Sequence, residues 1–175
     1  PIRAVINPMT DAPHFESPVS RAAAAVILIG AATIIGAWLF QMAGYAPCPL
    51  CLQQRIPYYV GVPIAFITFV MARRMQGARL PAILIGLIGL IFLGGAVFAA
   101  YHAGVEWKFW PGPTDCSTGA GGPTSAGGLL DSINKTTLIR CDEAAFRLFG
   151  LSLAGYNVLI SLALAGIALG AAFKR

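Results

Sequence analysis

Residues 80–105 read LPAILIGLIGLIFLGGAVFAAYHAGV, a run that contains no Asp, Glu, Lys or Arg. An α-helix needs about 20 consecutive apolar residues to cross the hydrocarbon core of a bilayer, so this run is long enough to span a membrane. Three further stretches are equally free of charged residues, namely residues 22–54, 56–72 and 148–173. The sequence therefore predicts four membrane-spanning helices.

The overall composition agrees with a chain whose main solvent is lipid. Of the 175 residues, 57% are hydrophobic and only 11% are charged, and the mean hydropathy is +0.74. Soluble domains have about 45–50% apolar and about 25% charged residues. Segments in lipid must satisfy their own backbone hydrogen bonds, which excludes an open sheet. We expect an all-α, integral membrane four-helix bundle with two extracytoplasmic loops.

The polar segments divide the chain into a tail and one helical domain. Residues 1–20 are polar and proline-rich, without the apolar run of a signal peptide, and we expect them to form a poorly ordered cytoplasmic tail. Residues 21–173 are expected to form the four-helix domain. Its helices are predicted at about 22–45, 56–72, 80–102 and 149–172, with outer loops at about 46–54 and 103–147.

The distribution of charge predicts how the bundle is oriented. With four spans, both termini share one side with the short loop at residues 73–79. That side has seven basic and two acidic residues, whereas the other side has five of each. The positive-inside rule therefore places both termini in the cytoplasm. The net charge of +5 does not indicate a nucleic-acid partner, because the basic residues are not clustered with aromatic stacking groups.

All four cysteines, Cys48, Cys51, Cys116 and Cys141, lie in the two loops assigned to the outside. Disulfides persist outside the cytosol, so this placement agrees with the orientation inferred from charge. Cys48 and Cys51 form a CxxC pair at the start of a predicted helix, where free N–H groups and the helix dipole favour a thiolate at Cys51. Arg55 lies one turn further along the same helix face and could stabilise that thiolate. These features predict a redox pair at the membrane surface.

Two interpretations of the cysteines that involve no redox chemistry remain open at this point. Cys116 and Cys141 have 24 residues between them, and a structural disulfide closing that loop would stabilise the fold by about 3 to 4 kcal/mol. A CxxC bridge, by contrast, constrains the unfolded chain very little. A zinc site could use four thiolates, although such sites usually pair two CxxC elements. His102, near the outer end of its helix, could be a plain interfacial side chain.

Three sequence strings resemble one known family. They are PCPLCLQQR at 47–55, YHAGVEWKFWPGPTDC at 101–116 and CDEAAFRLFGLSLAGYN at 141–157. In this order they resemble the disulfide bond formation protein B (DsbB) family of bacterial inner membranes, and the similarity extends over about residues 20–173. The resemblance implies a multi-pass protein of the inner membrane with periplasmic cysteines.

The resemblance also implies a role for each site residue. Cys116 would be attacked by a reduced periplasmic thiol oxidase of the DsbA type, which releases Cys141 to attack Cys48 and frees Cys51. Electrons would then pass from Cys51 to a membrane quinone, either ubiquinone or menaquinone. The resemblance places Arg55 and His102 beside the quinone ring.

Other functions remain open beside this one. The glycine-rich segment between Cys116 and Cys141 differs from better known members, so a dedicated substrate could replace the general oxidant. A reversed electron flow would need an inward-facing thiol, and the sequence has none. A non-enzymatic metal-binding or structural membrane protein is the remaining alternative.

Overall fold

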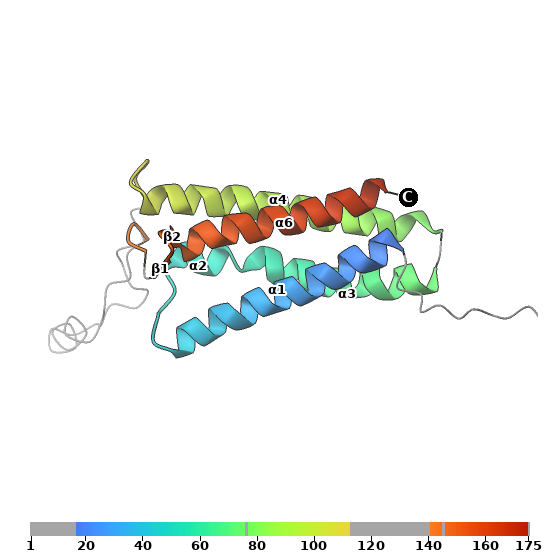
Figure 1. The fold of residues 1–175 in the computed structure, drawn as a ribbon, viewed down its shortest axis with the longest axis horizontal. Coiled ribbons are helices and arrows are strands. Elements are labelled where there is room, and N and C mark those ends of the chain that lie inside the picture. Colours follow the sequence, from blue (N-terminus) through green and yellow to red (C-terminus); the bar gives the residue numbers. More distant parts are fainter. Residues whose placement is uncertain (1–16, 76, 113–140, 145, 175) are drawn as a thin grey trace, which may run out of the picture.

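The computed structural model describes residues 17–75, 77–112, 141–144 and 146–174. Four long helices lie side by side (Figure 1): α1 (Pro18–Met42), α3 (Ile56–Arg74), α4 (Arg79–Glu106) and α6 (Leu153–Phe173). A short helix, α2 (Pro49–Gln53), precedes α3. A small hairpin of β1 (Arg147–Leu148) and β2 (Leu151–Ser152) precedes α6. Most of the predicted N-terminal tail and most of the second outer loop lie outside the described residues.

The prediction of an all-α four-helix membrane bundle is confirmed. Four helices are long and apolar enough to cross a membrane when α2 and α3 are counted as one span, Pro49–Arg74. Large apolar side chains point outward from the bundle, among them Leu28, Phe66, Val97 and Leu159. Such faces are suited to lipid contact, so the chain is a multi-pass membrane protein.

The tightest packing in the bundle is between α4 and α6, which share the most extensive contact of any helix pair. Gly89 of α4 makes this approach possible, because a Cβ atom there would lie only 2.6 Å from Cγ of Leu169. Small residues at helix interfaces are a common way for membrane helices to pack closely. The buried core beside this contact includes Ile85, Phe92 and Leu164.

The first outer loop is shorter than expected and contains a helix. Helix α1 ends at Met42 rather than near residue 45, and α2 occupies part of the segment expected to be loop at 46–54. Cys48 has an extended backbone conformation and acts as the N-cap of α2. Pro49 follows in the first turn, where the missing N–H of proline costs no hydrogen bond. The CxxC motif is therefore the start of a helix.

The two later helices also differ from their expected ends. Helix α4 continues one turn past residue 102 to Glu106, so this residue lies on the helix rather than in a loop. Helix α6 begins at Leu153, later than the predicted residue 149. The delay arises because Phe149 and Gly150 have φ values of 50° and 84° and form the tight turn of the β1–β2 hairpin.

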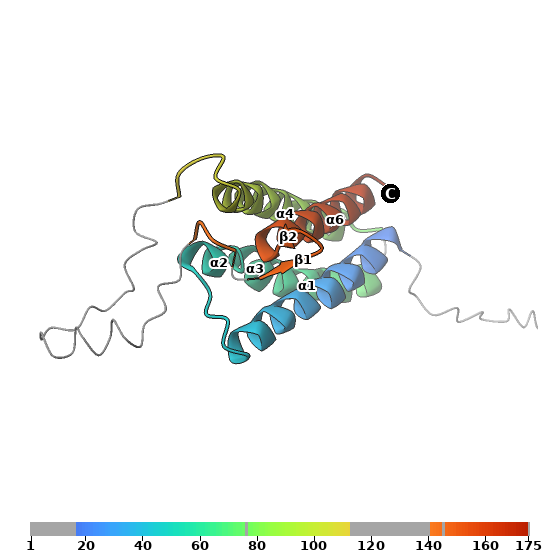
Figure 2. The same ribbon diagram turned by 60° about the vertical axis from the view of Figure 1, so that its left-hand side comes forward.

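One end of the bundle holds most of the chemically interesting residues. Figures 1 and 2 show α2, the β1–β2 hairpin and the C-terminal end of α4 together at this end. The C-terminus and the start of α1 lie at the opposite end. Residues that are distant in the sequence can therefore meet around the CxxC motif.

Candidate functional site

The CxxC motif is held at the N-terminus of α2 by its own capping interaction. The sulfur of Cys48 accepts a hydrogen bond from the backbone N–H of Cys51 at 3.2 Å. This contact satisfies one of the N–H groups that a helix leaves free in its first turn. It also brings the Sγ atoms of Cys48 and Cys51 to 2.7 Å from each other, with both thiols free. The two sulfurs are thus placed as a redox pair.

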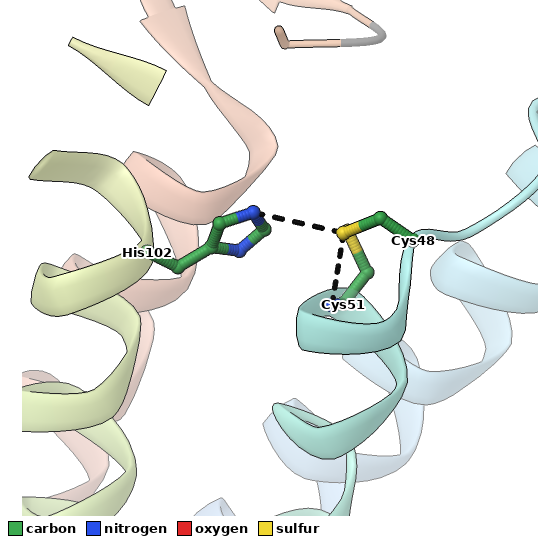
Figure 3. A group of neighbouring side chains, drawn as sticks. All are labelled: Cys48, Cys51 and His102. Carbon is green, nitrogen blue, oxygen red and sulfur yellow. Dashed lines mark hydrogen bonds between the residues drawn. The ribbon is translucent and has the colours of Figure 1, made fainter. Parts of the chain in front are cut away.

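His102 of α4 faces this pair from across the bundle. Figure 3 shows its imidazole ring directed at the sulfur of Cys48, and Nε2 lies 3.6 Å from that sulfur. The His102 side chain is only 1% exposed. The sequence placed His102 near the outer end of a helix, and the structure puts it in direct contact with the CxxC motif.

The hydrogen bonds around Cys48 favour its thiolate. The hydrogen bond from the Cys51 thiol is the main cause that lowers the pKa of Cys48 to about 5. Burial opposes this effect, while contacts with the His102 ring and the Cys51 amide lower the pKa further. The structure differs here from the sequence analysis, which placed the low-pKa thiol at Cys51. The reason is that the sulfur of Cys48, as the N-cap, accepts hydrogen bonds from Cys51, first from its thiol and to a lesser degree from its backbone N–H.

Arg55 occupies the short break between α2 and α3. Its Nη1 atom donates a hydrogen bond to Oε1 of Gln41 on α1 at 3.0 Å. The expected continuous helix from Cys51 to Arg55 is interrupted, because α2 ends at Gln53 and α3 begins at Ile56. Arg55 and Cys51 nevertheless line one common cavity.

This cavity has a volume of about 280 Å³ and lies among α1, the segment before α2, the start of α3 and the start of α6. Its walls are mostly apolar and include Phe40 and Tyr45. Cys51, Gln54 and Arg55 contribute polar groups on one side. His102 is not one of the described residues that line the cavity. The ring of His102 contacts Cys48 instead.

A chain of buried polar side chains extends from His102 into the bundle, and the sequence analysis did not identify it. Nε2 of Gln54 lies 2.6 Å from Nδ1 of His102. Asn157 of α6 donates from Nδ2 to Oε1 of Gln54 at 2.7 Å. The hydroxyl of Tyr58 in turn donates to Oδ1 of Asn157 and is paired with the hydroxyl of Ser161. Gln54 and Tyr58 are four residues apart in the sequence, and this spacing is the one signal that could have pointed to the chain.

Glu106 is a further residue that the sequence analysis did not select as part of the site. It is 7% exposed, and its Oε1 lies 3.9 Å from Nε2 of His102. The spacing of four residues places both side chains on one face of α4. Its other oxygen, Oε2, has no hydrogen-bond partner among the described residues. A buried carboxylate oxygen without a partner is costly, so this position merits a functional explanation.

Three of the four predicted cysteines are described, and they lie together. Cys141 is 2% exposed and packs in one buried cluster with Cys48 and Leu50, against which Cys51 also packs. Cys141 is disulfide-bonded. Cys116 lies outside the described residues. The loop before β1 thus brings Cys141 to the CxxC motif.

The site also has the donor types of a metal centre. The ligand atoms of Cys48, Cys51 and His102 all lie within 4.8 Å of one another. Zinc binds cysteine thiolates and histidine nitrogens, so the residue types fit. Binding through Nε2 of His102 would require a free lone pair on that nitrogen, which depends on the partner of Nδ1.

Comparisons with known proteins find a similarity that extends over most of the chain. Residues 20–171 match the family described as disulfide bond formation protein DsbB. An uncharacterized protein of Rickettsia prowazekii (strain Madrid E) is 27% identical over 122 residues, which cover 69% of this chain and 67% of that protein. Disulfide bond formation protein B of Nitrosomonas eutropha (strain DSM 101675 / C91 / Nm57) is 38% identical over 80 residues, covering 45% and 48%. The second alignment thus spans about half of that relative. No solved structure shows a significant similarity.

Proposed function

The chain belongs to the DsbB family of disulfide bond formation proteins, and on this premise we propose that it reoxidises a periplasmic DsbA-like thiol oxidase and passes the electrons to membrane quinone. The observation that supports this most strongly is the position of the free CxxC pair. It lies between the buried Cys141 and an apolar cavity lined by Cys51 and Arg55. Cys48 can therefore exchange with Cys141 on one side, and Cys51 can meet a lipid-soluble electron acceptor in the cavity on the other side.

The proposed location is the bacterial inner membrane, with the CxxC motif on the periplasmic side and both termini in the cytoplasm. Arg21 and Lys174 lie at the bundle end opposite α2. So do Arg73 and Arg74 at the end of α3 and Arg79 at the start of α4. An excess of basic residues favours the cytoplasmic side. The end with the cysteines would then face an oxidising compartment, where disulfides persist.

The packing of Cys141 against Cys48 supports one order of thiol exchange. In this proposal, the partner's thiolate attacks Cys116 of a Cys116–Cys141 disulfide and releases the Cys141 thiolate. That thiolate attacks Cys48 of the oxidised CxxC pair, so a Cys48–Cys141 disulfide forms and Cys51 leaves as a thiolate. Each exchange breaks one S–S bond and forms another. The partner's second thiolate then attacks the mixed disulfide, so that the oxidised partner leaves and Cys116 becomes a thiolate. Attack of Cys116 on Cys141 re-forms their disulfide and releases the Cys48 thiolate. Cys48 and Cys51, whose sulfurs lie 2.7 Å apart, would re-form their own disulfide by giving two electrons to a bound quinone.

The cavity beside Cys51 fits the head of a quinone by the nature of its walls. Its aromatic and aliphatic walls suit a flat apolar ring, and Arg55 contributes a positively charged guanidinium to the cavity that Cys51 also lines. When bound, a quinone would accept two electrons and two protons. The task of Arg55 would be to stabilise a Cys51 thiolate and to orient an oxygen of the ring. The proposed acceptor is ubiquinone or menaquinone.

Two serine variants test the proposal. In membranes or detergent, with a reduced DsbA-type protein and added ubiquinone, we expect Cys51→Ser to abolish quinone reduction. Cys116→Ser should block electron transfer from the DsbA-type protein but leave the CxxC pair reducible by dithiothreitol. Undiminished quinone reduction by Cys51→Ser would refute the assignment. A wild-type protein that reduces quinone with dithiothreitol, but not with the DsbA-type protein, would indicate a dedicated substrate.

A further inference from the structure

The buried polar chain beside the CxxC motif has a defined direction. Asn157 uses its Nδ2 atom to donate to Gln54, so Oε1 of Gln54 is the accepting atom. The other end of the Gln54 amide, Nε2, therefore faces Nδ1 of His102 at 2.6 Å. An amide nitrogen has two N–H donors and does not accept hydrogen bonds. The direction of the chain is thus fixed up to the imidazole ring.

This direction determines which nitrogen of His102 bears the proton. Since Gln54 donates to Nδ1, the lone pair of Nδ1 must accept that hydrogen bond. A neutral imidazole has one donor and one acceptor nitrogen, so its hydrogen must be on Nε2. Nε2 is the atom that lies 3.6 Å from the sulfur of Cys48. The opposite tautomer would bring two N–H groups face to face at 2.6 Å.

We propose that Gln54 is a positioning residue that holds His102 as the Nε2–H tautomer, so that the imidazole ring donates a hydrogen bond to the sulfur of Cys48. The surroundings of Nε2 favour the same tautomer from the other side. The Cys48 sulfur at 3.6 Å and Oε1 of Glu106 at 3.9 Å can both accept a hydrogen bond from Nε2. A donor thus faces Nδ1, and acceptors face Nε2.

The chemical consequence concerns the oxidising strength of the CxxC pair. This step rests on the proposed function, in which the Cys48–Cys51 disulfide must accept electrons that come from the reduced form of a strong thiol oxidant. A disulfide is more oxidising when its reduced, thiolate form is stabilised. An N–H directed at the Cys48 sulfur stabilises that form, whereas a lone pair directed at it would repel a thiolate. Gln54 would therefore make the CxxC disulfide more oxidising, and it would do so through the His102 ring.

The same tautomer bears on the metal-binding alternative. A zinc ion bound by Cys48, Cys51 and His102 would need the lone pair of Nε2. In the Nε2–H tautomer, this lone pair is replaced by a proton. Zinc binding would therefore require Gln54 and Asn157 to reverse their amide orientations. The hydrogen-bond chain disfavours a resident metal at this site.

Nitrogen-15 NMR of labelled histidine tests the tautomer directly. The chain has two histidines, so His14→Gln leaves His102 as the one labelled ring. In the reduced protein we expect the directly bonded proton on Nε2. Gln54→Glu should move it to Nδ1, because a carboxylate accepts hydrogen bonds and does not donate them. A proton on Nδ1 in the otherwise wild-type ring would overturn the proposal, whatever the variants do.

A redox titration measures the consequence. In a Cys116→Ser, Cys141→Ala background, where the CxxC pair is the remaining dithiol, we expect Gln54→Leu to make the disulfide about tenfold harder to reduce by glutathione, since a charge-assisted hydrogen bond is weakened. The matched control is Gln53→Leu, the same change at an exposed neighbour, which should leave the equilibrium unaltered. Equal effects of both variants, or stoichiometric zinc bound through His102, would overturn the proposal. Neither measurement needs quinone or a partner protein, so a failure of the proposed electron transfer would be seen separately.

Discussion

The thiol of Cys48 in the reduced protein is expected to ionise near pH 5. Its sulfur receives a hydrogen bond from the Cys51 thiol, and the His102 ring and the Cys51 amide add two further contacts. An ordinary thiol, with a pKa of about 8.5, is about 3% ionised at pH 7, whereas a pKa of about 5 gives about 99%. Thiolate ultraviolet absorbance of the reduced Cys116→Ser, Cys141→Ala protein, followed from pH 4 to pH 10, measures the difference.

Two substitutions separate the causes of this low pKa. Cys51→Ala removes the largest cause and should raise the Cys48 pKa by about one to two units, the equivalent of a hydrogen bond to a charged group. His102→Leu should raise it by less. Because the pKa is lowered on folding, ionisation stabilises the reduced protein above the unfolded pKa, and this stabilisation is lost as the pH falls through about 5. A single titration near pH 8.5 in the parent protein would refute the reasoning.

Two further predictions concern packing and the cavity. Gly89→Ala should lower the free energy of unfolding by about 1 to 3 kcal/mol, because the new Cβ would lie 2.6 Å from Leu169. Denaturant unfolding in detergent measures this, and Gly94→Ala, where a Cβ meets nothing within 4 Å, is the control that should be close to neutral. Arg55→Met should raise the KM for ubiquinone about tenfold or more through loss of a charged contact, while leaving glutathione exchange at the CxxC pair unchanged. An unaltered KM for the Arg55 variant in the quinone reduction assay would contradict its placement beside the acceptor.

The four spans were predictable because their signal is local. Each is an uninterrupted run without charge, and the bilayer sets its length, so no knowledge of packing is needed. The ends were less predictable, since they depend on capping and turn geometry. Cys48 caps α2 and Phe149 adopts a positive φ in a tight turn, and neither residue is a common choice for its position.

The candidate site was only partly predictable for the same reason. The CxxC motif, Arg55 and His102 could be selected by residue type and by the resemblance to a family. The chain through Gln54 and Asn157 could not, because it joins the end of α2 to α6 across 103 positions of sequence. Sequence patterns report neighbours along one helix, whereas this contact depends on how two helices are rotated against each other. Glu106 was missed because its burial follows from the extra turn of α4.

The two sulfurs of the CxxC motif face different surroundings, and this difference bears on the order of electron transfer. Cys48 packs with Cys141 and receives the His102 contact, but it does not line the cavity. Cys51 lines the cavity together with Arg55. In the proposed cycle, exchange with the protein side therefore occurs at Cys48 and departure toward the membrane occurs at Cys51. The hydrogen-bond donors around Cys48 stabilise its thiolate when the pair is reduced. Attack of Cys141 on Cys48 releases the sulfur of Cys51, which is the one that lines the cavity. One helix N-terminus thus separates two reactions that would compete if both sulfurs faced the same side.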